Sequence, residues 1–461
     1  MSKFKKLNLI FLSLAWIHTG TPQLFASEAA TNDIHLMGLA VYSPSGGVVD
    51  SFNASEKGKG YVLPEIKPTC YPKALTFTED GGPTSGKSVY LSAICDEADK
   101  RSIALAKYSL EFDKLADRFL GKGWGAIEFL VPFSLRWYPS DITAIALDKS
   151  RRLHVFGEIR EKGNKPDPGV FVQRLEETGY VDHTFNVEGL ATRTDISQGT
   201  IGSLGQDGTA YFLRPSKGDA KGPVLLFSAA PDGTEKTLEI QLGLGEAVPM
   251  GTAVGENGQI YVYGHTRPDA ERRLFVARIN EIGDGLDKTF GKDGVSVFGF
   301  GEQSPMSTKL KIKNGKIYIL GLLYAQNRSN QGEIFNFPAI AVLNSDGSLD
   351  SSFSGDGRRI LEFASRPRTA LYPYFKDIAI SNNGLIYLLG EANDSVAIIA
   401  IDPSGEIARG FGAERDSEDG LLLDRSFKMP GSTKLKAVSG VAITLDEAGN
   451  LIVLVDVTAY K

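Results

Sequence analysis

Two stretches of the chain gather residue types that could bind a cation or a phosphate group. The first, "SLDSSFSGDGRRILEF" at residues 348–363, places the side-chain oxygens of Asp350, Ser352 and Asp356 close together. It lacks the spaced acidic series and the terminal Glu of a dedicated calcium loop. It also lacks the Lys-Ser/Thr ending and the following helix of a phosphate-binding loop.

A repeated structural hinge is the third interpretation of this stretch. Asp350 can accept hydrogen bonds from the turn, Gly355 and Gly357 allow backbone conformations that other residues avoid, and Phe353 can fill an apolar niche. A similar motif, "GLDKTFGKDGVSVF", occupies residues 285–298. The Phe recurs at Phe52, Phe119, Phe185, Phe290, Phe353 and Phe411. Because each unit of a repeat protein must bury part of a shared core, we predict that the motif is structural.

The period of the repeat is close to 60 residues, because 359 residues separate Phe52 from Phe411 over six intervals. One unit, around "TEKTLEIQLGLG" at residues 234–245, has no such Phe. Each unit also carries a turn followed by an apolar strand, as in "AVGENGQIYVYGH", "LKIKNGKIYILGL" and "AISNNGLIYLLGE", and seven copies can be counted. A unit of this length holds four short strands with their turns.

The strands of these units must be covered on both faces. Runs such as "VAIIAI" are apolar at successive positions, which is typical of strands buried on both sides. A ring of four-stranded sheets covers both faces and leaves only short edges exposed. The sequence therefore predicts an all-β fold, a seven-bladed β-propeller. An open β-solenoid, which usually has a shorter period, and separate β-sandwich domains, for which no linkers are found, are the alternatives.

The two ends of the chain predict how the ring closes. The segment "DIHLMGLAVYSPSGGVVDSF" matches the third strand and hinge of a unit, and the final "GVAITLDEAGNLIVLVDVTAY" matches only the first two strands. Two half-units make one blade. We expect residues 34–42 to pair with residues 450–457 and so close the ring.

A family resemblance rests on the repeated hinge motif, the Asp/Gly-rich segment around the recurring Phe. The period and the Asp-x-x-Phe-Gly-x-Asp-Gly core, best shown by "LDKTFGKDG" and "LDSSFSGDG", resemble the bacterial delta-60 repeat family, which is similar to seven-bladed propellers. The resemblance covers essentially the whole chain after its leader, although only two units carry the full motif. It implies architecture and export more than any particular activity, since propellers host enzymes, binding modules and scaffolds alike.

Compartment is indicated by the N-terminus, where Lys3, Lys5 and Lys6 precede an apolar run and small residues. This pattern predicts a secretory signal peptide over residues 1–26, a short flexible segment over 27–33 and a single propeller domain over 34–461. No later segment is long and apolar enough to span a membrane, so we expect an exported protein, periplasmic or extracellular. Cleavage would move the formal charge from −6 to −9, which disfavours nucleic acid as a partner.

The two cysteines of an exported chain are expected to form a disulfide. Cys70 and Cys95 lie symmetrically about the turn signal "GGPT" at residues 81–84, so an antiparallel hairpin folded there would place them opposite one another. Two unrelated buried thiols are the alternative.

Residues that could carry catalysis are few. Four histidines follow the leader: His35, His154, His183 and His265. His154 stands inside a strand pattern and His183 inside a hinge, whereas His265 has no evident partner. The predicted first strands contribute Thr143, Ser203, Thr308, Lys309, Lys376 and Asp377. No nucleophile elbow or zinc signature is present, so we assign no catalytic residue and no metal ligand and predict no cofactor.

Variable loops indicate a binding face. In a propeller, the loops between second and third strands share a face with the connections between blades, which here include "VPFSLRWYPS" and "ASRPRTALYPYF". The candidates are Arg136, Trp137, Tyr138, Arg366, Arg368, Tyr372 and Tyr374. Tyr, Trp and Arg dominate binding hot spots, although aromatic packing between blades would use the same residues.

The preferred function is a binding or scaffold module for an unknown protein or glycan. The alternative is a lactonase-like propeller hydrolase or lyase that uses a divalent cation in the central channel. That alternative requires acidic or Asn ligands converging from several blades.

Overall fold

The computed structural model defines most of the chain after residue 32. It describes residues 33–49, 52, 61–63, 70–82, 85–97, 100–110, 114–116, 119–127, 137–161, 168–186, 190–193, 200–214, 222–267, 272–280, 285–301, 304–326, 334–362, 373–412, 420–427 and 434–460. The predicted signal peptide lies outside these residues. Within them, no helix has the length and apolar character needed to cross a membrane.

Seven antiparallel sheets make up the described chain, and each is called a blade. Blade 1 contains β3 (Cys70–Gly82), β4 (Ser85–Glu97), β5 (Lys100–Ser109), β6 (Lys114–Leu115) and β7 (Trp124–Ile127). Blade 2 contains β8 (Trp137–Leu147), β9 (Leu153–Glu161), β10 (Pro168–Leu175) and β11 (Leu190–Arg193). Blade 3 contains β12 (Ser203–Leu204), β13 (Ala210–Arg214), β14 (Val224–Ala229) and β15 (Glu235–Ile240). Blade 4 contains β16 (Ala247–Val254), β17 (Ile260–Thr266), β18 (Leu274–Arg278) and β19 (Val295–Phe298).

The remaining blades complete the sequence of elements. Blade 5 contains β20 (Ser304–Lys313), β21 (Lys316–Gln326), β22 (Ile334–Leu343) and β23 (Arg358–Ile360). Blade 6 contains β24 (Tyr374–Ile380), β25 (Ile386–Ala392), β26 (Ser395–Ile401) and β27 (Leu421–Asp424). Blade 7 contains β28 (Lys434–Leu445), β29 (Leu451–Tyr460), β1 (Asp33–Tyr42) and β2 (Tyr61–Val62). A short helical turn, η1 (Phe119–Gly121), lies in blade 1.

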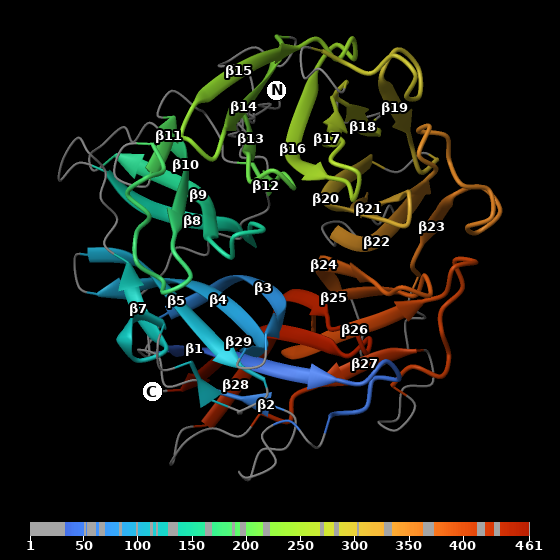
Figure 1. Cartoon of the computed structure of the whole chain (residues 1–461). Coiled ribbons are helices and arrows are strands. Elements are labelled where there is room, and N and C mark those ends of the chain that lie inside the picture. Colours follow the sequence, from blue (N-terminus) through green and yellow to red (C-terminus); the bar gives the residue numbers. More distant parts are fainter. Residues whose placement is uncertain are drawn as a thin grey trace, which may run out of the picture.

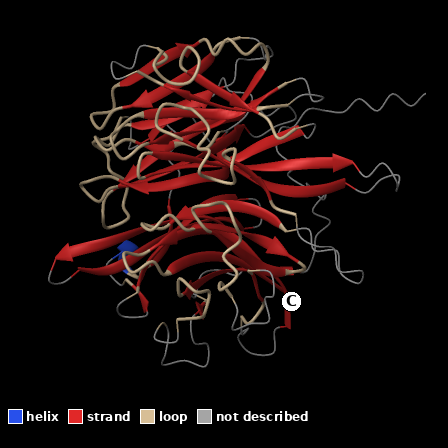
Figure 2. Cartoon of the chain, turned by 90° about the vertical axis from the view of Figure 1, so that its right-hand side faces the viewer, coloured by secondary structure: helices blue, strands red, loops and turns tan. Residues whose placement is uncertain are grey.

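The blades form a ring, as Figure 1 shows. The first strand of each blade lies innermost, because β3, β8, β12, β16, β20, β24 and β28 contact one another in that order and β28 contacts β3 again. In the side view of Figure 2 the loops gather at the ends of the strands. The predicted all-β, seven-bladed β-propeller is therefore confirmed.

Ring closure joins the two ends of the chain. β1 pairs antiparallel with β29 from Asp33 opposite Tyr460 to Tyr42 opposite Leu451. Blade 7 therefore takes its two inner strands from the C-terminus and its two outer strands from the N-terminus, as the sequence predicts. Over their described residues, β1 and β29 are paired along their whole length.

Both faces of the third strands are buried, as their composition predicts. In β26, Val396 and Ile398 belong to the apolar cluster shared with blade 7. Ala397 and Ile399 belong to the cluster shared with blade 5. One strand thus contributes to two seams, and a seam here means the interface between neighbouring blades.

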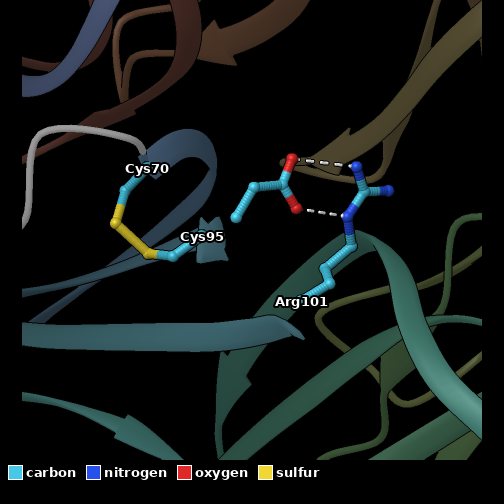
Figure 3. The surroundings of a disulfide bond; sticks show 4 residues. Cys70, Cys95 and Arg101 are labelled. Atoms are coloured by element: carbon cyan, nitrogen blue, oxygen red, sulfur yellow. Dashed lines mark hydrogen bonds and ion pairs between the residues drawn. A yellow bond between two sulfur atoms is a disulfide. The ribbon is translucent and has the colours of Figure 1, made fainter. Parts of the chain in front are cut away.

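The disulfide between Cys70 and Cys95 is present. The two residues lie opposite one another on β3 and β4, so the hairpin prediction is confirmed. Beside the bond, Arg101 makes a bidentate pair with Asp96 (Figure 3), with Nε 2.6 Å from Oδ1 and Nη2 3.0 Å from Oδ2. The loop that the disulfide closes spans 25 residues, for which the chain-entropy estimate is about 3 kcal/mol.

Each hinge Phe fills a seam. The six side chains are at most 4% exposed, and each belongs to the cluster between its own blade and the next. In order around the ring they are Phe119, Phe185, Phe290, Phe353, Phe411 and Phe52. The seventh seam, between blades 3 and 4, is built from aliphatic residues and Phe275.

In four hinges, the residue after the Phe links the hinge to the next blade. Leu120, Gly291, Ser354 and Gly412 have positive φ, and this bend aims their N–H groups across the seam. Their donor–acceptor distances to carbonyl oxygens of the following blade are 2.6–2.8 Å. The acceptors are the carbonyl oxygens of Thr178, Asp346, Ser404 and Ser45, respectively. The Asp/Gly-rich motif is therefore a joint between blades.

Two hinges add an arginine to this joint. Arg278 donates from Nε to Asp287 at 2.8 Å and from Nη1 to the carbonyl oxygen of Ser345, in the next blade, at 2.6 Å. Arg174 makes the same pair of contacts with Asp182 and the carbonyl oxygen of Pro231. In the hinge of blade 4, hydrogen bonds from Thr289 lower the pKa of Asp287, and the charge of Arg278 lowers it further, although burial acts to raise it. Burial raises the pKa of Asp182, but hydrogen bonds from Thr184 and the charge of Arg174 outweigh it.

The unit without a hinge Phe is joined to its neighbour differently. Ile201, before β12, donates its N–H to the carbonyl oxygen of Met250 in β16 at 3.0 Å. It accepts from the N–H of Thr252 at 2.9 Å. The innermost segments of blades 3 and 4 thus form a parallel bridge, so backbone pairing takes the place of the missing aromatic side chain.

A β-bulge recurs at the same place in six inner strands. It lies between the residue that pairs with the last residue of motifs such as "IYLLG" and the residue that pairs with the fourth. In β24 the bulge lies between Phe375 and Asp377. It brings the inner strand so close to β25 that a Cβ at Gly390 would overlap the carbonyl oxygen of Tyr374. A Cβ at Gly264 would overlap the carbonyl oxygen of Val248 in the same way, which explains the glycine at these two positions.

We expect Gly390→Ala to destabilise the protein by about 1–3 kcal/mol, the usual cost of overpacking a buried site. Gly410→Ala is the matched control, because a Cβ there meets nothing within 4 Å. Urea unfolding of both variants measures the difference. Equal stability of the two variants would show that the bulge can relax.

Acid should weaken the hinges. Because the pKa values of Asp182 and Asp287 are lowered on folding, their stabilisation is complete above the unfolded value of about 4 and disappears as pH falls through the folded values. We therefore expect Asp287→Asn to cost about 1–3 kcal/mol at pH 7 and to flatten the loss of stability between pH 5 and 2. Asp356→Asn, at an exposed ion pair with Arg358, should cost less than about 1 kcal/mol. Identical acid profiles for wild type and Asp287→Asn would contradict this assignment.

Candidate functional site

A cavity of about 830 Å³ opens at one mouth of the central channel. Its wall comes from residues of the inner strands β3, β20, β24 and β28 and from the turns that follow β24 and β28. The polar part of the wall includes Lys311, Lys313, Ser381, Asn382, Asn383, Thr444 and Asp446. The apolar part includes Phe77, Ile312, Ile380 and Leu445. A volume of this size lies in the range of pockets that bind small organic molecules.

Two turns shape the rim of the cavity. In the turn after β24, Ser381 donates from Oγ to the carbonyl oxygen of Leu385 at 3.1 Å, and its hydroxyl also contacts Asn383. In the turn after β28, Asp446 accepts from the backbone N–H of Asn450 at 2.8 Å. These local hydrogen bonds fix both turns, so the rim is preformed.

An ion pair ties three inner strands together beneath the cavity. Lys309 Nζ in β20 lies 3.7 Å from Asp377 Oδ1 in β24. The other oxygen of Asp377 accepts from the backbone N–H of Ile443 in β28 at 3.0 Å. The Asp377 side chain is 8% exposed, so its charge is held mainly by these two contacts. They fix blades 5, 6 and 7 relative to one another where they form the cavity.

Lys311 and Lys313 extend from β20 into the cavity wall. Lys313 pairs with Glu256 at 3.2 Å. The Lys311 side chain is exposed to solvent and lines the cavity among the inner strands. Desolvation by the protein lowers the pKa of Lys311, and the positive charge of Lys309 adds to the effect while Asp377 opposes it.

A second polar cluster lies toward the other ends of the inner strands. Lys376 donates to Ser439 Oγ at 2.8 Å and to Glu391 Oε2 at 2.9 Å, and Ser439 also donates to Glu391. Burial would raise the pKa of Glu391, but Lys376 and Ser439 together hold it below its usual value. The cluster joins blades 6 and 7, as the 2.9 Å pair of Lys73 and Asp141 joins blades 1 and 2.

Of the predicted binding face, Tyr138 and Tyr374 are described, and they lie near the starts of their inner strands, away from the cavity. Tyr374 begins β24 and Ile380 ends it, a distance of about 20 Å at roughly 3.3 Å per residue. Burial, with Glu391 nearby, raises the pKa of Tyr374, and the Nζ of Lys376 lies 5.7 Å from its ring centroid. Tyr138 is half-buried near the start of β8. Trp137 opens β8, but its side chain lies outside the described residues, as do Arg136, Arg366, Arg368 and Tyr372.

The histidines occupy separate places. His154 is fully buried in β9, and burial lowers its pKa to about 4. His265 is buried in β17, and His183 is exposed in the hinge of blade 2. His35 Nδ1 lies 3.0 Å from Asp456, and its ring stacks 4.4 Å from Tyr71. Within the described part of the chain, no three His, Cys, Asp or Glu side chains gather as metal ligands would.

Sequence reasoning singled out Lys309, Lys376 and Asp377 but did not pair them. It missed Lys311 and Lys313, although both stand in the same predicted first strand as Lys309. The signal that could have found the cavity is the alternation of Lys309, Lys311 and Lys313 in one predicted strand. Three charged residues at period two place one polar row on one side of an inner strand.

Comparisons with known proteins give only distant similarities. No family model matches the chain, and no curated protein matches it. Among solved structures, a polysaccharide lyase shares 11% identity at a TM-score of 0.44, over 92% of this chain and 98% of that one. A protein from Lactobacillus plantarum shares 10% identity at a TM-score of 0.40, over 81% of this chain and 94% of that one.

Prolyl oligopeptidase B from Galerina marginata shares 12% identity at a TM-score of 0.39, over 85% of this chain. The alignment spans 48% of that enzyme, so the chain corresponds to about half its length. At these identities and TM-scores the similarities carry no argument about this chain. The class that the structure defines is the seven-bladed β-propeller.

Lys309 and Asp377 should be energetically coupled. We expect Lys309→Met and Asp377→Asn each to lower the free energy of unfolding, by about 1–3 kcal/mol, because each leaves a polar partner without its counterpart. The double variant should cost less than the sum by at least about 0.5 kcal/mol. Urea unfolding of the four proteins gives the coupling energy. Strict additivity would mean that the 3.7 Å contact contributes nothing.

Proposed function

We propose that the chain is an exported binding module that takes a small ligand into the cavity at the channel mouth. The observation that carries the proposal is the cavity itself, because four blades contribute apolar and polar groups to one preformed concave wall. Ligand sites in proteins are typically such concave surfaces, mostly apolar with a few placed polar groups. A disulfide that joins two strands of one blade is consistent with export.

Membership of the delta-60 repeat family forms part of this proposal. It is supported by the hinge motif, whose Phe and following positive-φ residue recur as joints between blades. The predicted signal peptide, residues 1–26, supports export to the periplasm or the medium. Neither the family nor the export of the protein indicates which ligand it binds.

A protein or glycan partner on the opposite loop face remains a separate prediction. That face would use Arg136, Trp137, Tyr138, Arg366, Arg368, Tyr372 and Tyr374. The lactonase-like alternative finds less support, because two inner-strand carboxylates that the structure describes, Asp141 and Asp377, are each paired with a lysine. We therefore favour binding over cation-assisted hydrolysis.

Filling the cavity should abolish binding. In a thermal-shift screen of small sugars, sugar acids, acylated amino acids and short peptides, we expect the wild type to respond to a subset. Thr444→Trp places an indole in the cavity wall and should weaken those responses at least tenfold in concentration. Thr237→Trp, the same change at an exposed position of β15, should leave them unchanged.

A loop-face variant separates the two binding predictions. Tyr374→Ala should keep the responses that Thr444→Trp loses. If Tyr374→Ala abolishes binding while Thr444→Trp retains it, the loop face is the binding surface and the cavity is not.

A further inference from the structure

The charges on the cavity wall are unequally satisfied. Lys313 is paired with Glu256 at 3.2 Å. Asp446 accepts hydrogen bonds from Asn450 and lies 3.6 Å from Lys87 Nζ. Glu447, at the exposed tip of the same turn, is engaged as well. Every one of these charges therefore has a partner already.

Lys311 is the exception. Among the described residues that line the cavity, it is the one charged side chain with neither a hydrogen bond nor an ion pair. The nearby carboxylate of Asp377 is taken by Lys309 at 3.7 Å and by the backbone N–H of Ile443 at 3.0 Å. The cavity therefore presents one ammonium group that has no ion pair or hydrogen bond of its own among the described residues. Desolvation by the protein lowers the pKa of Lys311, and the nearby charge of Asp377 only partly opposes this.

The surroundings of Lys311 define the shape of a matching ligand. A single ammonium is a compact point charge without the two-pronged geometry of arginine, so it neutralises one negative charge. The amide side chain of Asn382 lies on the same wall, where it can donate a hydrogen bond. Ile380 and Leu445 are half-buried on the wall and offer apolar surface. One charge, one amide donor and an apolar wall fit a small organic monoanion.

We propose that the cavity binds a small organic carboxylate, whose carboxylate group pairs with Lys311 while its body lies against Ile380 and Leu445. This inference rests on the proposed function, since it assigns the chemistry of the same cavity. The carboxylate can come from a sugar acid or from an acylated amino acid, because both present the same group to the ammonium.

Matched ligand pairs test the proposal. Isothermal titration uses glucuronate against glucose, and N-acetyl-leucine against its uncharged amide, so that only the carboxylate differs within a pair. We expect the charged member of at least one pair to bind the wild type at least tenfold more tightly. The pair that shows the difference identifies the source of the carboxylate.

Three lysine variants assign the effect to one residue. Lys311→Met should reduce the preference for the charged member to less than about twofold, whereas Lys311→Arg should restore part of it. Lys313→Met is the matched control, because that lysine lines the same cavity but already has Glu256 as a partner; it should keep the preference. Circular dichroism and thermal melts show whether each variant is folded.

The outcomes separate this inference from the proposed function. If charged and neutral members bind equally and Thr444→Trp blocks both, the cavity is the binding site but the carboxylate proposal is wrong. A preference that survives Lys311→Met also overturns the proposal. If no member binds the wild type at concentrations on the order of 10 mM, a range that detects free energies of only a few kcal/mol, the carboxylate proposal fails, and the wider screen decides the proposed function.

Discussion

The structure depends on how each blade is joined to the next, because a four-stranded sheet that is apolar on both faces cannot be stable alone. At six seams a hinge Phe supplies the buried contact, and at four of them the following residue is seen to donate its N–H group across the seam. That bond requires positive φ, which glycine adopts readily and which Leu120 and Ser354 adopt here at some cost. One short motif therefore fills the seam with an apolar side chain, provides a hydrogen bond for a backbone N–H group and bends the chain toward the next blade.

The sequence predicts this architecture well because its signals are local and repeated. The hinge motif, the hairpin turn between the cysteines and the two half-units at the ends each lie within a few tens of residues, and all three predictions are confirmed. The sequence also shows where one unit departs from the repeat. The unit that lacks a Phe is the one whose inner segment bridges sideways, from Ile201 to β16.

The cavity could not be predicted in the same way. Its parts come from different repeats: Lys309 and Asp377 are one full unit apart in sequence, and Ile443 is another unit further on. Their meeting depends on the recurring bulge in the inner strands, which shifts side chains by one position relative to a regular ladder. The alternating lysines of β20 mark a polar side of one strand, but they do not show which residues of other repeats that side meets.

The pairing of β1 with β29 sets the order in which this protein can mature. Asp33 and Tyr460 lie more than 400 residues apart and yet are partners in one ladder. Apart from two residue pairs with β2, the first strand therefore has no partner in its own blade until almost the entire polypeptide has emerged. The Cys70–Cys95 hairpin, by contrast, has both of its strands within 28 residues. Oxidation can precede closure, and a chain that stops short of residue 451 presents an unpaired strand edge. Such long-range pairing slows folding, so truncated products are exposed to association or proteolysis in a way that full-length chains are not.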